Sequence, residues 1–252
     1  MKIKGSHSNL STFLSFSKLR TFDIKNNIKY LSFIVLLSVG VVFAAINKPV
    51  DAYGAGDFVI EIDTSKGDNP SYAIPVGFYS MNYSVDCDND GVLEATDQTA
   101  SYTCTYPSHG IYTIAISGNF PHFYNGNVAT DNNQKKLIDV KQWGSQVWKS
   151  LSSAFYNASN LDISATDTPN LSETTSLASM FMNASTFNGA LNGWNISNVK
   201  DLSYMFFGAS SFNQPLNSWD VSQVANFYSM FYGANTFNQS LDIWDTSSAR
   251  QI

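Results

Sequence analysis

LSYMFFGASSFNQPLNSWDVSQVAN, residues 202–226, decides the fold, because its pattern recurs 25 residues earlier and 25 residues later. The recurring positions hold a Met-Phe pair, an alanine, a Phe-Asn pair, a leucine and a tryptophan. In the three copies these are Met180-Phe181, Met205-Phe206 and Met230-Phe231; Ala184, Ala209 and Ala234; Phe187-Asn188, Phe212-Asn213 and Phe237-Asn238; Leu191, Leu216 and Leu241; and Trp194, Trp219 and Trp244. A fixed period of roughly 20 to 50 residues is the sign of a repeat architecture, in which one unit cannot bury its apolar face alone. The sequence therefore predicts consecutive units that stack.

Each unit contains two apolar patterns in succession. The first has the spacing of the core of leucine-rich repeats, where a short strand points alternate residues inward. Its positions in one unit are Leu191, Trp194, Ile196 and Val199. The second has apolar residues at i, i+3, i+4 and i+7, which is one face of a short helix, at Leu202, Met205, Phe206 and Ala209. Each unit is thus predicted to be strand, helical turn and return loop.

The stack is expected to occupy residues 143–252, with a connector and a capping strand at 119–142. Ile252 stands where other units begin their helical turn, as at Leu202 and Phe227. A stack that stops there leaves its last strand without a helix over it. We therefore expect that these 252 residues are a truncated piece and that further units follow.

The repeat Met-Phe-x-x-Ala-x-x-Phe-Asn-x-x-Leu-x-x-Trp-Asp-Val-Ser-x-Val closely resembles the BspA-like leucine-rich repeat surface proteins, a mycoplasma-type family of unknown function. The resemblance covers roughly residues 136–252. It implies exposure at the cell surface and adhesion to proteins of a host or a neighbouring cell, with no known catalysis. It does not identify a ligand.

Residues 57–118 read as short strands in which β-branched and aromatic residues alternate with polar ones. The expected strands are 58–62, 72–76, 83–85, 102–106 and 111–116. They predict a compact antiparallel sandwich. With the repeats, the predicted fold class is mixed β and α/β: a small antiparallel β-sandwich followed by a leucine-rich-repeat-like solenoid of 25-residue units.

The segment YSVDCDNDG at 83–91, followed by CTYPSHGIYTI at 104–114, resembles the PKD family of extracellular immunoglobulin-like sandwiches. In those domains, an acidic turn that contains Gly follows one core strand. The last two strands carry a Tyr and then the pattern Gly-x-Tyr-x-hydrophobic. This chain lacks the usual Trp-Asp-Phe-Gly-Asp-Gly run and is shorter. The resemblance implies a spacer or presentation module without chemistry of its own.

The acidic turn also has the spacing of a calcium loop. Six residues match positions of an EF-hand-like loop: Asp86, Asp88, Asp90, Gly91, Glu94 and Asp97 stand at positions 1, 3, 5, 6, 9 and 12. Against this interpretation, helices flank an EF-hand whereas strands are expected here, and the last ligand is Asp instead of a bidentate Glu. An acidic hairpin turn and a calcium site both stay open.

Charge and cysteine usage indicate export. Six of the 14 Lys and Arg residues precede residue 30, and residues 30–47 carry no charge. This is the layout of a secretory signal or an N-terminal membrane anchor, assigned to 1–46, and either one exports the chain beyond residue 50. The chain beyond residue 30 has 8 basic against 19 acidic residues, which excludes nucleic acid as a partner. Cys87 and Cys104 are predicted to form a disulfide between neighbouring strands.

Outward positions of the predicted repeat strands form the expected binding face. These are Asn195, Asp220 and Asp245, with Ser197, Ser222 and Ser247 beside them. Exposed polar rows on a stack of repeats are where such proteins recognise partners. The tryptophan, methionine and phenylalanine positions are expected to be core, and the Asn188, Asn213 and Asn238 positions to form a hydrogen-bonded ladder.

The sequence favours an exported, non-catalytic, adhesin-like surface protein with no cofactor. Its expected partner is an extracellular protein or glycan, and it meets the membrane only through its N-terminal segment. Two alternatives stay open, a structural spacer of the cell envelope and a secreted carbohydrate-active enzyme, because acid pairs far apart in sequence can be close in space.

Overall fold

The computed structural model of the chain describes residues 34–36, 42–44, 53–126 and 132–252. Contacts divide the chain into two compact units, Met1–Val50 and Asp51–Ile252. In the first unit, β1 (Ile34–Leu36) pairs antiparallel with β2 (Val42–Ala44). The predicted signal or anchor at 1–46 lies largely outside the described residues. Within the described ranges, no helix has the length and apolar character needed to cross a membrane.

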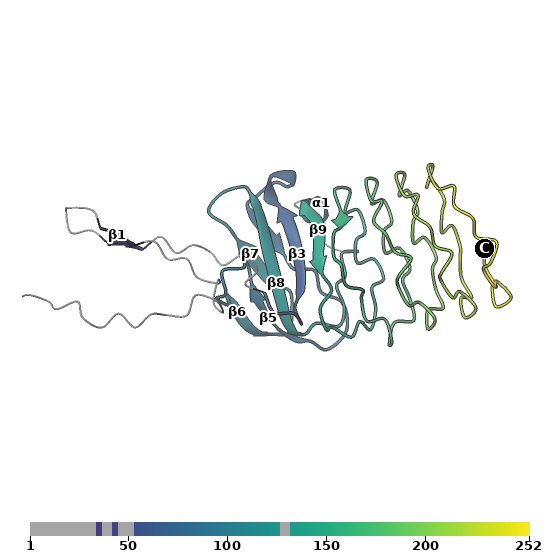
Figure 1. The fold of residues 1–252 in the computed structure, drawn as a ribbon, viewed down its shortest axis with the longest axis horizontal. Helices are drawn as coiled ribbons and strands as arrows, with labels where there is room; N and C mark the ends of the chain where they lie inside the picture. Colours follow the sequence, from purple (N-terminus) through teal and green to yellow (C-terminus); the bar gives the residue numbers. More distant parts are fainter. Residues whose placement is uncertain (1–33, 37–41, 45–52, 127–131) are drawn as a thin grey trace, which may run out of the picture. The chain divides into compact units, whose positions relative to one another are not determined.

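The second unit begins with a six-stranded sheet in the order β10-β9-β3-β8-β5-β6 (Figure 1). Its strands are β3 (Phe58–Asp63), β5 (Asn82–Asp86), β6 (Ala95–Gln98), β8 (Ile111–Asn119), β9 (Leu137–Gln142) and β10 (Asp162–Ile163). All neighbours are antiparallel except β9 and β10, which are parallel. A separate antiparallel pair joins β4 (Ser71–Ala73) to β7 (Thr103–Thr105). Each of the five strands expected in 57–118 has a counterpart, although β4 covers only the beginning of the expected 72–76 and β6 is an additional strand.

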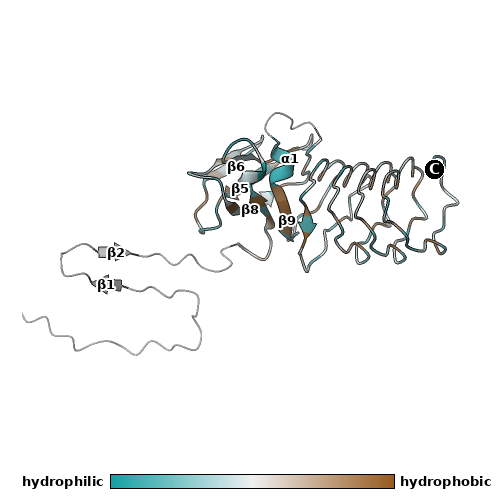
Figure 2. Ribbon diagram, turned by 90° about the horizontal axis from the view of Figure 1, so that it is seen from above, coloured by the Kyte–Doolittle hydropathy of each residue, from teal (hydrophilic) through white to brown (hydrophobic). Residues whose placement is uncertain are grey.

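Helix is almost absent from the part of the chain that the structure describes. It consists of a 3-10 turn, η1 (Thr64–Lys66), and the single turn of α1 (Asn133–Lys136). Figure 2 shows that α1 is hydrophilic, whereas much of β8 and of β9 is hydrophobic. The described chain is therefore a β-rich fold.

One core runs from the sheet into the repeats. Phe58 on β3 is fully buried, and its ring lies 5.8 Å from that of Trp143 and 4.9 Å from that of Trp148. Trp143 in turn meets Trp194 edge to face at 5.2 Å. Such aromatic pairs contribute about 0.5–1.5 kcal/mol beyond their area burial. The sheet therefore supplies the apolar surface on which the first repeat packs.

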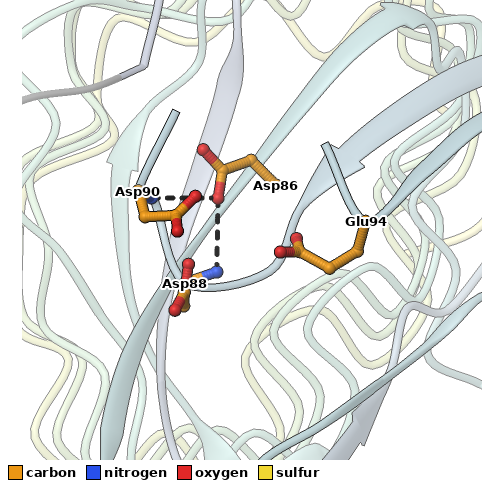
Figure 3. A group of neighbouring side chains, drawn as sticks. All are labelled: Asp86, Asp88, Asp90 and Glu94. Atoms are coloured by element: carbon orange, nitrogen blue, oxygen red, sulfur yellow. Dashed lines mark hydrogen bonds between the residues drawn. The ribbon is translucent and has the colours of Figure 1, made fainter. Parts of the chain in front are cut away.

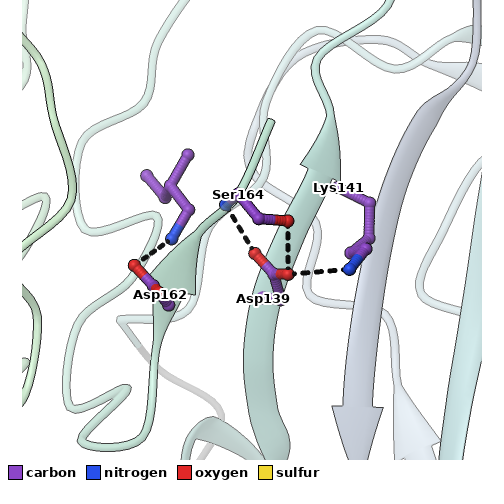
Figure 4. Close-up of polar contacts among 5 residues, drawn as sticks. Asp139, Lys141, Asp162 and Ser164 are labelled. Carbon is purple, nitrogen blue, oxygen red and sulfur yellow. Dashed lines mark hydrogen bonds and ion pairs between the residues drawn. The ribbon is translucent and has the colours of Figure 1, made fainter. Parts of the chain in front are cut away.

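Asp139 on β9 fixes the first repeat against the edge of the sheet (Figure 4). Its carboxylate accepts the backbone N–H of Ser164 at 2.8 Å and the Ser164 hydroxyl at 2.6 Å. Lys141 lies 3.1 Å from the same carboxylate and balances its charge. Because Ser164 follows directly on β10, this contact holds β10 parallel to β9.

The repeats form successive coils, one coil being the path of one 25-residue unit. Figure 1 shows them following one another from β9 to the C-terminal end. Isolated parallel bridges join Ser176 to Asp201, Asp201 to Asn226, and Asn226 to Gln251. The residues predicted to point inward do so, since Leu202, Met205, Phe206 and Ala209 are all fully buried. The stacking of consecutive units is thus present.

The predicted helix in each unit is wrong. Tyr204 and Gly208 have φ angles of 56° and 68°, outside the right-handed region that a helix needs. Alternate backbone N–H groups bond across to the next coil: Tyr204 N–H to Tyr228 O, Phe206 N–H to Met230 O, and Gly208 N–H to Tyr232 O, at 2.8–2.9 Å. The N–H groups between them bond only three residues back, as Met205 N–H does to Leu202 O at 3.2 Å, and not four residues back as in an α-helix. The hydrogen bonds between adjacent coils form an inter-coil ladder, which occupies the segment where the helix was expected.

The predicted strand in each unit is also wrong. Residues 191–199 form turns, with Trp194 N–H donating to Leu191 O at 3.0 Å and Val199 N–H to Ile196 O at 2.8 Å. The fold class of a leucine-rich-repeat solenoid built from strands and helices is therefore overturned. The predicted antiparallel sandwich is overturned as well, because β9 and β10 extend its main sheet into a mixed one.

The predicted disulfide is present, with the Cα atoms of Cys87 and Cys104 5.6 Å apart. Its location differs from the prediction of two neighbouring strands. Cys87 directly follows β5 of the large sheet, and Cys104 lies on β7 of the two-stranded sheet. The bridge therefore ties the two sheets together.

Candidate functional site

The predicted polar row is exposed, and its oxygens are used in local turns. The side-chain oxygens of Asn195, Asp220 and Asp245 each accept the backbone N–H two residues later, at 3.2, 3.0 and 3.0 Å. Those donors are the predicted partner serines Ser197, Ser222 and Ser247. Side chains of this type commonly bond their own backbone to close a turn. The row therefore has a structural role that the strand prediction did not include.

The serine hydroxyls lower the pKa of both acids in the row. The Ser222 hydroxyl, followed by the Ser222 backbone N–H, holds the pKa of Asp220 below its usual value. Ser247 lowers the pKa of Asp245 in the same way. Hydrogen bonds to the charged form favour that form, so both acids carry their charge at neutral pH.

Two members of the row also line a shallow hollow of about 320 Å³ between adjacent coils. Its lining is Asn192, Gly193, Trp194, Asn195, Ile196, Ser218 and Asp220. The Ser218 hydroxyl donates to the side chain of Asn192 at 2.7 Å, which uses part of the polar lining. The assignment of this row as a binding face stays a prediction.

The structure reveals an aromatic patch, defined here as Tyr204, Phe207, Tyr228 and Tyr232. The ring of Tyr204 lies 5.2 Å from that of Tyr228 and 5.8 Å from that of Phe207. Phe207 stacks on Tyr232 at 5.0 Å. Tyr228 is 48% exposed and Tyr232 is 68% exposed. Contacts between the rings therefore join residues of two adjacent coils into one surface.

The inter-coil ladder places this patch outside the core. Met205 and Phe206 are buried, and the residues on either side of them, Tyr204 and Phe207, are partly exposed. Equivalent positions in the preceding coils hold Tyr156 and Met182, since Asn157 N–H bonds to Met182 O and Asn183 N–H to Phe207 O, at 2.8 and 2.7 Å. The patch thus continues a row of large side chains along the stack.

Sequence reasoning missed this patch although a signal was present. Tyr204, Phe207, Tyr228 and Tyr232 do not fall on the inward positions of the repeat. Large aromatic side chains outside the core pattern need a reason, because polar residues would be tolerated there. Residues 202–208 and 227–233 also contain no charged side chain, so the surface is apolar and rich in hydroxyl groups.

The acidic loop brings together four of the five predicted calcium ligands (Figure 3). One carboxylate oxygen from each of Asp86, Asp88, Asp90 and Glu94 lies within 4.8 Å of the others. Asp97, the fifth, lies on β6 and is exposed outside this group. The loop joins β5 to β6, so strands flank it as expected.

Backbone hydrogen bonds fix the shape of this loop. The two oxygens of Asp86 accept the N–H groups of Asp88, Asp90 and Gly91 at 3.4, 3.2 and 2.8 Å. Gly91 has a φ of 88°, which a side chain would strain. Glu94 accepts the N–H of Cys87 at 2.5 Å. Backbone N–H groups therefore hold the carboxylates of Asp86 and Glu94 in place.

A buried histidine lies between the sheet and the repeats. His122 is 3% exposed, and burial lowers its pKa below the ordinary 6.5, an effect that the Ser152 backbone partly offsets. Its backbone carbonyl accepts the N–H of Gly77 at 3.1 Å. A Cβ at Gly77 would lie 1.8 Å from the imidazole Nδ1, so this contact requires glycine. His122 therefore has a structural environment typical of a packed core residue.

Comparison with known proteins supports the repeat assignment. Neither the search of curated proteins nor the search of solved structures found a match to this chain. A family match covers the coils and is compatible with the BspA-like, mycoplasma-type repeat expected from the sequence. Residues 149–252 match the family described as Mycoplasma protein of unknown function, DUF285.

Proposed function

We propose that this protein is an exported, non-catalytic binding protein of the cell surface, and that the aromatic patch contacts an extracellular protein partner. The observation that carries the proposal is the exposure of Tyr228 and Tyr232, at 48% and 68%, within a continuous group of rings. The BspA-like character of the repeats and the PKD-like character of residues 57–118 belong to this proposal.

The chemistry of the patch suits protein recognition. Tyrosine supplies a large, amphipathic contact area and loses little conformational entropy when it is fixed. Tyrosine is also enriched among the residues that dominate the energy of protein interfaces. Tyr204 and Phe207 brace Tyr228 and Tyr232 through ring contacts of 5.0–5.8 Å, so the patch is largely formed before a partner arrives. Such preorganisation lowers the entropic cost of binding.

Export is supported by chemistry elsewhere in the chain. The Cys87–Cys104 disulfide is stable in an oxidising compartment and is rare in reducing ones. The basic leader followed by the uncharged residues 30–47 is typical of an exported protein. Together these features favour an extracellular partner over an intracellular one.

The test is binding of the immobilised full-length chain to panels of extracellular proteins and glycans. The Tyr228→Ser, Tyr232→Ser double variant should bind its protein partner at least about tenfold more weakly, because two interface tyrosines are lost. Ile243→Ser is the matched control, since Ile243 is 72% exposed in the same part of the repeats and lies outside the patch. It should bind like the unaltered chain.

Three outcomes would contradict the proposal. Binding to glycans alone, with no protein captured, would assign the surface to a different class of ligand. A chain that binds neither panel would favour the structural spacer. Equal loss in the double variant and in Ile243→Ser would show that the effect is unrelated to the patch.

A further inference from the structure

The loop between β5 and β6 has the sequence DCDNDGVLE, residues 86–94, in which an acid recurs at every second position before Gly91. The structure directs four of its carboxylates toward one point (Figure 3). Acidic residues at a surface turn ordinarily spread apart because like charges repel. Their convergence within 4.8 Å is therefore a first indication of a cation.

Buried oxygens that lack hydrogen-bond donors are a second, independent indication. The Oδ1 atom of Asp88 is shielded from solvent and accepts no hydrogen bond. Asn89, the next residue, is 7% exposed, and its Oδ1 atom is shielded and without a donor as well. Buried polar atoms in folded proteins are almost always paired with a protein group, a water or an ion. The Oδ1 atom of Asp88 belongs to one of the four converging carboxylates and is therefore available to a cation bound among them.

The charges around the loop also favour a bound cation. No Lys or Arg occurs between Lys66 and Lys135, so no basic residue adjoins the loop along the chain. The ion pairs Lys141–Asp139 and Lys149–Glu173 do not involve the loop. Four carboxylates held together without a counter-charge are unfavourable. A bound cation would remove that repulsion.

We infer that Asp86, Asp88, Asp90 and Glu94 bind one calcium ion. Calcium takes six to eight oxygen ligands at about 2.3–2.6 Å, so two oxygens that share it are at most about 5 Å apart. The observed limit of 4.8 Å satisfies this condition. Magnesium requires shorter bonds of about 2.0–2.1 Å and keeps several waters, which suits a cluster of four carboxylates less well.

The loop can bind the ion without losing its own hydrogen bonds. A carboxylate has about four lone-pair sites, and the two oxygens of Asp86 use three of them for backbone N–H groups. The Oδ1 atom of Asp88 accepts no hydrogen bond, so its lone pairs can serve a metal. The site ends at Glu94, and Asp97 is not part of it.

Calcium at this site would stabilise the junction of the two sheets. Glu94 bonds the backbone of Cys87, and Cys87 is bridged to Cys104 on β7. The buried hydroxyl of Tyr106 donates to the carbonyl of Cys87 at 2.7 Å. The ion would therefore tie the loop to both sheets at one residue. This inference does not depend on the proposed binding function of the repeats.

The test uses the full-length chain, stripped with a chelator and titrated with calcium chloride by calorimetry. We expect one ion per chain, with a Kd of about 10⁻⁵ to 10⁻³ M, and a melting temperature that rises with calcium. Magnesium chloride at equal concentration should raise the melting temperature much less. Absence of binding heat together with an unchanged melting temperature would overturn the inference, and so would an equal response to magnesium.

Two substitutions locate the site. Asp88→Asn should weaken calcium binding at least about tenfold, because it removes a charged ligand without removing a hydrogen bond. Asp97→Asn is the matched control, since it makes the same charge change in the same region outside the four-carboxylate group, and it should bind calcium normally. If Asp97→Asn loses as much affinity as Asp88→Asn, the four carboxylates do not form the site.

The chelated proteins provide a check that does not depend on affinity. Without calcium, Asp88→Asn should melt at or above the temperature of the unaltered chain, because repulsion within the cluster is relieved. With calcium the order should reverse. Should Asp88→Asn fail to fold, Asp90→Asn provides the same comparison, since its amide oxygen can still accept the N–H of Val92. A calcium response that is unchanged in a folded variant of either kind would exclude the site.

Discussion

The sheet and the repeats satisfy their backbone hydrogen bonds in different ways. In the sheet, β3 pairs with β8 and with β9, strands that lie 48 and more residues away along the chain and have unrelated sequences. In the repeats from Ser153 onward, ladder bonds join residues 24 to 26 apart, such as Tyr204 N–H to Tyr228 O. Every coil therefore depends on an equivalent neighbour, while each strand depends on a distant and different partner.

This difference explains which predictions succeeded. Alternation of apolar and polar residues identified the five strands, because a period of two has few other structural solutions. The i, i+3, i+4 pattern at Leu202, Met205 and Phe206 predicts a helix, but turns that bond to a neighbouring coil bury the same residues. A helical pattern is thus less specific when an adjacent repeat can accept the N–H groups.

The largest expected effect comes from breaking the contact between coils in the core. Trp219 is 4% exposed, and its indole N–H donates to Leu191 O of the preceding coil at 2.9 Å. Trp219→Ala should lower the free energy of unfolding by about 3–5 kcal/mol. Urea denaturation measures this change. Trp244→Ala, at a partly buried position, should cost clearly less, and equal costs would contradict the assigned burial.

Removing the disulfide should affect the sheets more than the repeats. The Cys87→Ser, Cys104→Ser double variant loses a cross-link that spans 17 residues, worth about 3 kcal/mol by chain entropy. Hydrogen exchange should show faster amide exchange in β5 and β7, with the coils beyond residue 177 little changed. Uniform acceleration across the whole chain would show that the two regions unfold as one unit.

Gly208 distinguishes the observed turn from the helix that the sequence suggested. In a helix, Gly208→Ala would raise stability by about 0.5–1 kcal/mol. At the observed φ of 68°, with a Cβ 2.5 Å from the Asn183 side chain, the same change should lower it by about 1 kcal/mol or more. Thermal denaturation gives the sign. Stabilisation by alanine would restore the helix prediction.

The smallest expected effect concerns the seam where the two regions meet. Burial lowers the pKa of His122, so its neutral form is favoured in the folded state. The resulting stability is present above the unfolded value of 6.5 and is lost as pH falls from there toward the folded pKa. His122→Gln should flatten the dependence of melting temperature on pH below the unfolded pKa of 6.5. An unchanged slope would show that His122 does not contribute to it.

The candidate sites were predictable to different degrees. Spacing alone located Asp86, Asp88, Asp90 and Glu94, because ligands of one loop are close in sequence as well as in space. The polar row at Asn195, Asp220 and Asp245 was located as exposed, but its role in closing turns depends on a backbone path that the strand prediction had wrong. The aromatic patch needed the structure, because Tyr204 and Tyr228 occupy different positions of their repeats.

The sequence by itself determined the 25-residue period, the inward residues such as Met205 and Phe206, and the pairing of Cys87 with Cys104. Composition and spacing express these properties directly, since burial and cross-linking depend on side-chain type. Only the tertiary structure decided which backbone group bonds to which, that β9 extends the sheet, and that the disulfide joins two sheets. Backbone groups are the same in every residue, so their partners are set by the neighbours that folding brings within reach.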